Sequence, residues 1–243
     1  MTAPIRAHGP RTKLGRLFGE QRASWVRNAP RHLGCTAIDV AMKVFRPGRT
    51  FQFRGRTYPY AYAVYNHTLR NERCVEIPVV WELIRGQAGG RVLEVGNVLS
   101  HYFAVNHVVV DKYEKCRGVL NADLMDFRPS ERFDLIVSIS TLEHVGWDEE
   151  TRDPPKLLRA VEHLRSLLNP GGQLVYTSAL GYNQFLDESL RGPGLPHTEV
   201  HYLLRTAKYF GWRPATFDEV MAVRYGHPFP GGNAVMIAYS RAD

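Results

Sequence analysis

Three acidic residues stand where successive apolar runs of the sequence end. Glu94 lies in the first run, residues 92–95, and precedes Gly96. A short strand that ends in a glycine-containing turn brings backbone N–H groups close to a ligand, and α/β proteins build nucleotide sites in this way. Asp111 ends the second run, 17 residues after Glu94. This spacing is close to the offset of about 20 residues at which an acid accepts hydrogen bonds from ribose hydroxyls.

The third acid, Asp123, precedes the apolar Leu124. A carboxylate at this place can accept a hydrogen bond from an adenine amino group. Each acid also has a plain structural explanation, because Asp111 suits a turn at a strand end and Asp123 suits a helix cap. Taken together and in this order, the three acids favour an adenosine-containing ligand.

The elements that must position these residues alternate along the chain. Apolar runs predict strands and 3.6-residue periodicity predicts helices. Strands are expected at 92–95, 108–111, 133–140, 173–178 and 234–239, and helices at 98–105, 154–168 and 199–210. This alternation predicts a doubly wound, mostly parallel α/β sheet.

The segment before residue 90 has a different character. Phe51 and Phe53, then Tyr58 and Tyr60, recur at the two-residue spacing of a strand and are expected to place their rings on one face. Residues 66–84 have a helical pattern that Pro78 either kinks or divides. We therefore expect a helical and aromatic N-terminal extension.

The composition predicts a soluble globular protein, and the cysteine content fits the reducing cytoplasm. Of its 243 residues, 44% are hydrophobic and 23% are charged, which is ordinary for a globular protein. Cys35, Cys74 and Cys116 form no C-x-x-C pair, which argues against a disulfide framework and a cysteine zinc site. The chain shows neither a signal-peptide pattern nor an apolar run of the ~20 residues that span a bilayer, so no membrane association is expected.

Positive charge is concentrated at the beginning of the chain. Residues 1–56 contain twelve Lys and Arg against two acids, whereas the whole chain has a net charge of +7. A basic arm can bind an anionic partner such as nucleic acid or a membrane surface. It lacks a dense run of basic residues, so a solvated terminus is favoured over a nucleic-acid partner.

The series Val-Leu-Glu94-Val-Gly96, Val-Asp111, Ala-Asp123-Leu124 and Leu-Asn-Pro-Gly-Gly-Gln-Leu resembles the class I S-adenosylmethionine-dependent methyltransferases over residues 90–180. This resemblance implies a seven-stranded sheet whose last strand is antiparallel, and S-adenosylmethionine as cofactor. The cofactor-binding residues that it implies are Glu94, Gly96, Asn97, Asp111, Asp123, Leu124 and Ser140. Two of the family's three turn glycines are replaced here, so the backbone must approach the cofactor at Gly96.

The resemblance also draws attention to His144, which follows the fourth strand of the sheet. An imidazole with a pKa near ~6.5 suits a general base that takes the proton of an acceptor hydroxyl. A structural role for this Leu-Glu-His sequence is equally open. Glu143 could orient His144, although adjacent side chains tend to point apart, so a distant carboxylate is as plausible.

The expected acceptor is a carbohydrate. Residues upstream of the turn resemble those of bacterial sugar O-methyltransferases, among them mannoside 1-O-methyltransferases, which implies transfer to a sugar or polysaccharide-precursor hydroxyl. The expected acceptor-binding residues are Tyr65, Tyr182, Asn183 and His201. Methylation of nucleic-acid bases is disfavoured, because Ser140-Thr-Leu-Glu replaces the Pro-Pro-aromatic motif that follows the fourth strand in those enzymes.

Residues 148–153 are acidic and could hold Mg²⁺, but a solvated loop is favoured and no metal site is assigned. The chain is expected to form a single domain, 1–243, with a core at 90–243 and an N-terminal extension or lid, 1–85, that contributes to the acceptor pocket. An NAD-dependent oxidoreductase or epimerase and a non-catalytic RNA-binding module are the alternatives. The sequence leaves the oligomeric state open, a homodimer included.

Overall fold

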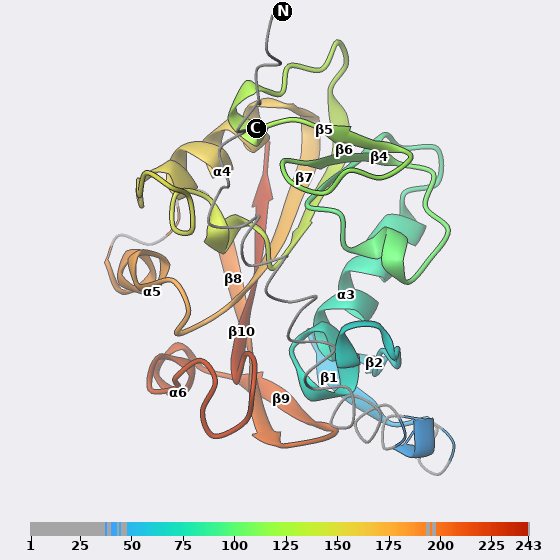
Figure 1. Ribbon diagram of the computed structural model, residues 1–243, viewed down its shortest axis with the longest axis vertical. Coiled ribbons are helices and arrows are strands. Elements are labelled where there is room, and N and C mark those ends of the chain that lie inside the picture. Colours follow the sequence, from blue (N-terminus) through green and yellow to red (C-terminus); the bar gives the residue numbers. More distant parts are fainter. Residues whose placement is uncertain are drawn as a thin grey trace, which may run out of the picture.

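The computed structural model describes residues 37, 40–42, 44, 48–192, 195 and 198–242. Eight strands of this part form one sheet in the order β5-β4-β3-β6-β7-β10-β8-β9 (Figure 1). The strands of this sheet are β3 (Val92–Val95), β4 (Val108–Asp111), β5 (Val119–Asn121), β6 (Phe133–Ile139), β7 (Leu168–Ala179), β8 (Thr198–Ala207), β9 (Gly211–Ala215) and β10 (Ala234–Arg241). Strands β3 to β7 pair in parallel, and β10 lies antiparallel between β7 and β8. The expected doubly wound, mostly parallel sheet with an antiparallel C-terminal strand is confirmed.

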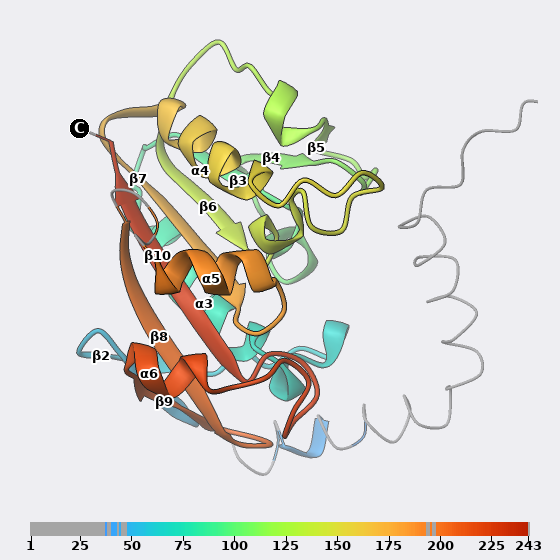
Figure 2. The ribbon, with the colours of Figure 1, turned by 90° about the vertical axis from the view of Figure 1, so that its left-hand side faces the viewer.

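Both faces of the sheet are covered. Helices α4 (Lys156–Ser166), α5 (Gln184–Arg191) and α6 (Phe217–Met221) follow one another over one face (Figure 2). Helix α3 (Arg73–Gly86) and the hairpin of β1 (Thr50–Phe53) and β2 (Arg56–Pro59) cover the other. Successive residues of a strand point to opposite faces, so Ile136 packs under α4 whereas Leu135 and Val137 pack under α3. Strand β6 is therefore apolar on both sides, as its near-continuous apolar sequence predicts.

In the described residues the sheet has eight strands where the resemblance implied seven, and residues 199–210 do not form the expected helix. They form most of β8, which pairs with β10 and with β9. Val200, Tyr202 and Leu204 pack on one face of the sheet and Leu203 on the other. Val200, Tyr202 and Leu204 alternate with Glu199, His201 and Arg205, which is the period of a strand, and the additional Leu203 lets the same run resemble the apolar stripe of a helix.

The expected helix at 98–105 is also shorter than predicted: only the 3₁₀ turn η2 (Leu99–His101) forms there. Further upstream, η1 (Tyr65–Arg70) precedes α3, which continues through Pro78 as a single helix. Proline has no N–H for the carbonyl four residues before it. That carbonyl, of Cys74, accepts the backbone N–H of Ala61 at 2.9 Å instead, and this bond ties the hairpin to α3.

The aromatic residues of the hairpin form core, as the two-residue spacing predicts. Phe51, Phe53, Tyr58 and Tyr60 are buried against α3 and the sheet. Of the expected N-terminal extension, residues 1–36 lie outside the described residues, whereas residues 37, 40–42 and 44 are helical. No helix in the described part of the chain is long and apolar enough to cross a membrane.

The packing of α4 on the sheet predicts a large effect of Leu164, which is fully buried there. We expect Leu164→Ala to lower the free energy of unfolding by about 2–5 kcal/mol, since the cavity it leaves cannot collapse completely. Leu120→Ala is the control, because Leu120 is 50% exposed on β5 and its loss should change stability by no more than about 0.5 kcal/mol. Urea denaturation measures both, and equal effects would contradict this packing.

Candidate functional site

The buried carboxylate of Glu94 organises the turn after β3. Its Oε1 accepts the backbone N–H groups of Val98 and Leu99 at 2.9 and 2.7 Å, and its Oε2 accepts a hydrogen bond from Nε2 of His107 at 2.8 Å. Glu94 therefore fixes the conformation of the turn through its hydrogen bonds to the backbone of Val98 and Leu99. Sequence reasoning missed His107, because it stands in no motif and its partner is contacted only across the fold.

Gly96 allows the turn to approach the end of β6. Its φ is +84°, and a Cβ atom at this position would lie 2.2 Å from Oγ1 of Thr141. The neighbouring Asn97 is buried, and its side chain contacts Ser100 and Cys116. A glycine is thus needed at position 96 for both its backbone conformation and its lack of a side chain.

Asp111 and Asp123 lie at the ends of β4 and β5, next to this turn. Oδ1 of Asp111 accepts the N–H groups of Tyr113 and Glu114 at 2.8 and 2.7 Å, while Oδ2 accepts, among the residues that the structure describes, only the N–H of Asn97 at 2.9 Å. A carboxylate oxygen has two acceptor positions. One position on Oδ2 is therefore left for a ligand hydroxyl.

Asp123 is more heavily engaged. Its Oδ1 accepts the N–H of Met125 at 2.9 Å, and its Oδ2 lies 2.7 Å from the ammonium of Lys112. Partial burial opposes ionisation, but Lys112 outweighs it and lowers the pKa of Asp123. The following Leu124 is buried in the core. Any ligand amino group at Asp123 must share this carboxylate with Lys112.

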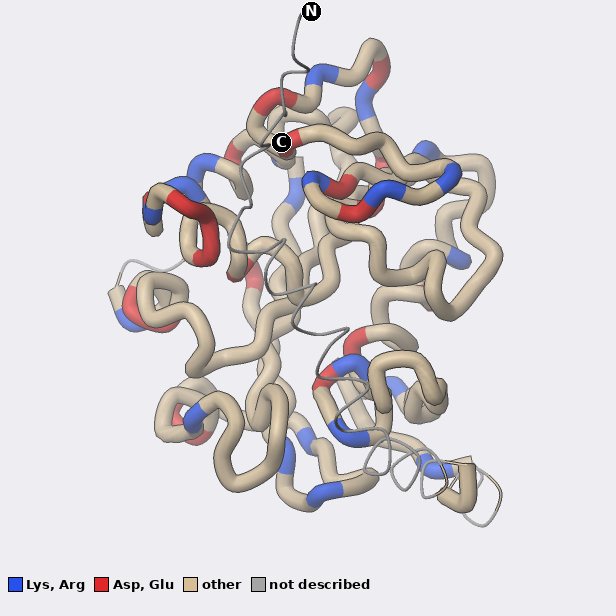
Figure 3. The backbone as a smooth tube through the Cα atoms, viewed as in Figure 1, with Lys and Arg blue, Asp and Glu red and all other residues tan. Residues whose placement is uncertain are grey.

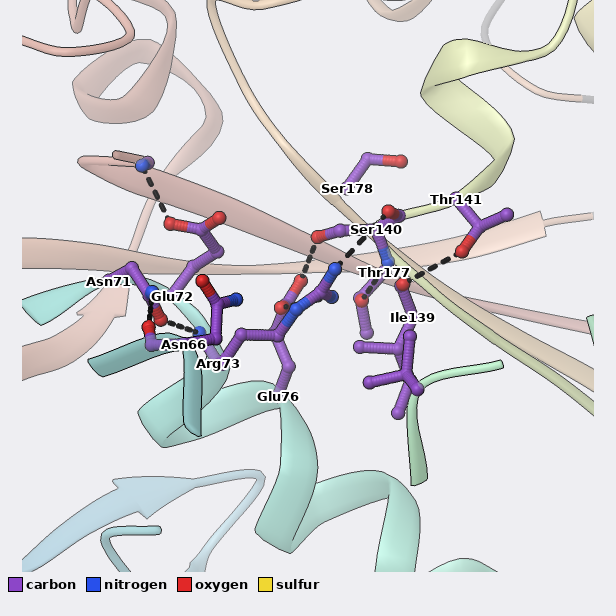
Figure 4. A network of polar contacts seen from close by, with 12 residues as sticks. Asn66, Asn71, Glu72, Arg73, Glu76, Ile139, Ser140, Thr141, Thr177 and Ser178 are labelled. Atoms are coloured by element: carbon purple, nitrogen blue, oxygen red, sulfur yellow. Dashed lines mark hydrogen bonds and ion pairs between the residues drawn. The ribbon is translucent and has the colours of Figure 1, made fainter. Parts of the chain in front are cut away.

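Polar side chains of α3 converge on the end of β6 (Figure 4). Oγ of Ser140 donates to Oε1 of Glu76 at 2.6 Å, and Nη2 of Arg73 donates to the Ser140 carbonyl at 3.4 Å. Arg73 also pairs with Glu76 at 3.1 Å. Burial raises the pKa of Glu76 to about 7, against the attraction of Arg73. In Figure 3, viewed as Figure 1, acidic and basic stretches of the tube lie next to each other where α3 begins.

His144 ends the turn η4 (Leu142–His144), which follows β6. Its Nδ1 lies 2.5 Å from Oδ2 of Asp148, and the hydroxyl of Tyr182 donates to the same oxygen at 2.6 Å. Partial burial opposes the charged imidazole, but the hydrogen bond to Asp148 and the charge of Glu143 outweigh it and raise the pKa of His144. Because Nδ1 is engaged, Nε2 is the nitrogen left to accept a proton.

The carboxylate that contacts the imidazole is that of Asp148, which sequence reasoning placed in the acidic loop without this partner. Glu143 is buried and its Oε2 accepts the hydroxyl of Ser178 at 3.0 Å. It acts on His144 through its charge. The sequence had left open whether Glu143 or a more distant carboxylate orients His144, because adjacent side chains tend to point apart.

His144 opens on a cavity of about 690 Å³ at the carboxyl edge of the sheet. Its walls come from four parts of the chain that are far apart in sequence. They include Asn66, His67, Arg70, Asn71, Glu72 and Arg73 before the core, Ser140, Glu143 and His144 after β6, Ala179 at the end of β7 with Tyr182 after it, and, from the last residues of β8 to the segment before β10, Arg205, Lys208, Tyr225, Pro230 and Gly231. The segment 66–73 thus faces the same cavity as the catalytic candidate.

The expected acceptor-binding residues are only partly brought together. Tyr182 lines the cavity, whereas Tyr65 is not among the lining residues and stacks on His101, with the ring centroids 4.4 Å apart. Asn183 is buried, where its amide donates to the Glu143 carbonyl and its oxygen caps α5. His201 packs against Phe53 beneath the hairpin, away from the cavity-lining residues.

The acidic loop does not gather its carboxylates into one place. Asp148 contacts His144 and Tyr182, whereas Glu149 pairs with Lys112 and Lys156. No group of three His, Cys, Asp or Glu side chains among the residues that the structure describes could hold a metal ion.

No protein-family model matches the chain, and no curated protein matches it in sequence. The N-methyltransferase NodS from Bradyrhizobium japonicum, crystallised with S-adenosyl-L-homocysteine, has a TM-score of 0.39 and 17% identity over 67% of this chain and 84% of that chain. An S-adenosylmethionine-dependent methyltransferase from Clostridium acetobutylicum has 0.36 and 10% over 68% and 89%. An rRNA methylase from Streptococcus thermophilus has 0.41 and 8% over 69% and 97%. These scores are too low to assign a function. The chain's own fold and strand-end residues define an α/β protein with a candidate ligand site at the carboxyl edge of its sheet.

The contact between Gly96 and Thr141 predicts that Gly96→Ala is more harmful than the same change at Gly118. Both glycines have positive φ, but a Cβ at Gly118 meets no atom within 4 Å. Gly118→Ala should therefore cost only the backbone strain, about 1–2 kcal/mol. Gly96→Ala should cost about 2 kcal/mol more, because Thr141 must move. Equal shifts of the urea midpoint would contradict the close approach.

Proposed function

We propose that this chain is an S-adenosylmethionine-dependent O-methyltransferase that acts on a hydroxyl of a sugar or a polysaccharide precursor. The observation that carries the proposal is the His144–Asp148 pair. It lies at the sheet edge that also carries the Gly96 turn, and it opens on a polar cavity. A hydroxyl acceptor requires a base beside it, and an imidazole fixed by a carboxylate supplies one.

The residues of the first three strand ends fit the cofactor. Gly96 and Asn97 would approach it with backbone, the open position on Oδ2 of Asp111 would accept a ribose hydroxyl, and Asp123 with Leu124 would contact the adenine. Ser140 would line the site from β6, while Glu94 would act by shaping the turn. Bound S-adenosylmethionine supplies an electrophilic methyl group, and the chain supplies no nucleophile of its own.

The remaining chemistry falls to residues of the cavity. His144 takes the hydroxyl proton at Nε2 as the acceptor oxygen attacks in line, and Asp148 stabilises the imidazolium that forms. Glu143 adds negative charge from its buried position. Tyr182 and Tyr65 would contact the carbohydrate, and segment 66–73 would make the N-terminal extension part of the acceptor pocket. The 1-OH of a mannoside is the particular acceptor that the sequence resemblance suggests.

The first test is binding. Calorimetry should detect binding of S-adenosylhomocysteine to the purified protein, and the absence of any binding would refute the proposal. A panel of sugar glycosides, screened for release of S-adenosylhomocysteine, then identifies an acceptor. With that acceptor, His144→Ala should lower kcat by about 10²–10⁴-fold, the usual contribution of a general base. Its affinity for S-adenosylhomocysteine should be unchanged, and an equal loss of both would make His144 structural.

The second test is the pH dependence of methyl transfer. The base must be neutral, so kcat/KM should rise with pH through the raised pKa of His144. Asp148→Asn removes the hydrogen-bonded charge and should move this rise to lower pH, with a lower maximum rate. Asp218→Asn, on the exposed side of α6, is the control and should leave the profile unchanged. A profile that Asp148→Asn does not move would contradict the role of the pair.

A further inference from the structure

Three charged side chains at the start of α3, those of Glu72, Arg73 and Glu76, contact two segments next to the cavity. Glu72 accepts the backbone N–H of Gly232 at 2.7 Å and so holds the loop before β10. Arg73 donates to the carbonyl of Ser140, and Glu76 accepts the hydroxyl of the same serine (Figure 4). Two of the three side chains thus converge on one residue, Ser140.

Ser140 has an unfavourable backbone conformation that its hydrogen bonds hold in place. Its φ is +37°, in the left-handed region that residues other than glycine rarely adopt. Its N–H donates to the carbonyl and to Oγ1 of Thr177 at 3.0 and 3.1 Å, while its hydroxyl and carbonyl contact Glu76 and Arg73. Strained residues of this kind persist only where their surroundings over-determine them, and they cluster at functional sites.

The two residues at this bend face different parts of the site. Ser140 lines the same cavity as His144. Thr141, the next residue, lies against Gly96 so closely that no Cβ fits between them. The conformation of Ser140 therefore sets how the turn after β3 is placed relative to the cavity.

We propose that Glu76 is a positioning residue for methyl transfer: by holding Ser140 in its left-handed conformation, it fixes the separation between the Gly96 turn and the acceptor cavity. This inference rests on the proposed function, because that separation matters only if a group passes from one to the other. Small displacements of bound reactants are enough to lower a rate by orders of magnitude. Glu76 is fully buried, so it acts through Ser140 and touches neither reactant.

A purely structural role of Glu76 gives a different expectation. Removing one partner of a buried ion pair leaves the other charge uncompensated, so a purely structural role predicts that Glu76→Leu is less stable, through Arg73, but keeps the kcat of the folded protein. Glu76→Leu keeps the volume and removes the acceptor, whereas Glu76→Gln keeps an oxygen that can accept the Ser140 hydroxyl. The pair of variants separates packing from positioning. Glu82→Gln is the matched control on the same helix, at an exposed site.

The experiment compares these variants in the full chain with the acceptor found above. Glu76→Leu should lower kcat by about ten- to a hundredfold, with KM for the acceptor changed by no more than about threefold. Glu76→Gln should restore kcat to within about threefold of the unaltered chain, and Glu82→Gln should not alter it. A folded Glu76→Leu variant with undiminished kcat would overturn the proposal, as would equal losses in Leu and Gln. If Glu76→Leu does not fold, Ser140→Ala removes the same hydrogen bond and carries the same expectation for kcat.

Amide hydrogen exchange provides a readout that needs no reaction. Exchange at residues 139–142 should accelerate by about tenfold or more in Glu76→Leu and not in Glu76→Gln. Unchanged exchange in Glu76→Leu would refute the claim that Glu76 keeps Ser140 in its left-handed conformation, even if the proposed function stands. Conversely, a chain that binds no S-adenosylhomocysteine but shows the accelerated exchange would refute the function and leave the hold on Ser140 intact.

Discussion

The carboxylate of Glu94 is the constraint on which the arrangement of the site depends. A buried carboxylate must be hydrogen-bonded, because burial without partners costs several kcal/mol. Glu94 meets this need with two backbone N–H groups of the turn and with His107. The chain after β3 is therefore forced into a tight turn, and η2 replaces the longer helix that could otherwise begin there.

The consequences of this turn extend to the neighbouring strands. The N–H of Asn97 is directed at Asp111, so the ends of β3 and β4 are tied together. Gly96 is pressed against Thr141, so the end of β6 is fixed relative to both. Ser140, the residue before Thr141, is held in turn by the buried carboxylate of Glu76 on α3, which accepts its hydroxyl. The same sheet edge thus has one wall shaped by Glu94 and another shaped by Glu76.

The acids at the strand ends and the cavity of His144 differ in how they are built. The acids at the ends of β3, β4 and β5 are committed largely to backbone groups and to Lys112, which leaves few open acceptor positions. The cavity of His144 is walled by residues from four parts of the chain, and its imidazole contacts a carboxylate four residues away. The Gly96 turn and this cavity therefore lie on one sheet but are built by different segments.

Local sequence predicted the elements whose neighbours are close along the chain. The apolar run of β6, the periodicity of α4 and the alternating rings of the hairpin each carry their own signal, and all three form as expected. The acids at the strand ends were found for the same reason: parallel strands bring their carboxyl ends to one edge, so order along the chain predicts proximity. The partners of those acids were not predictable. Glu94, for example, binds His107, which lies 13 residues further along the chain and stands in no motif.

The sequence by itself determined the α/β alternation and the candidacy of Gly96, Asp111 and His144, and the antiparallel last strand followed from its family resemblance. Only the tertiary structure decided that residues 198–207 form a strand, because their pairing with β10 and β9 outweighs the helical interpretation of the same apolar residues. It alone brought Asp148 to His144 and Glu76 to Ser140, 64 residues apart. Contacts of this kind depend on where the folded backbone brings side chains together, and no local pattern of residues encodes that.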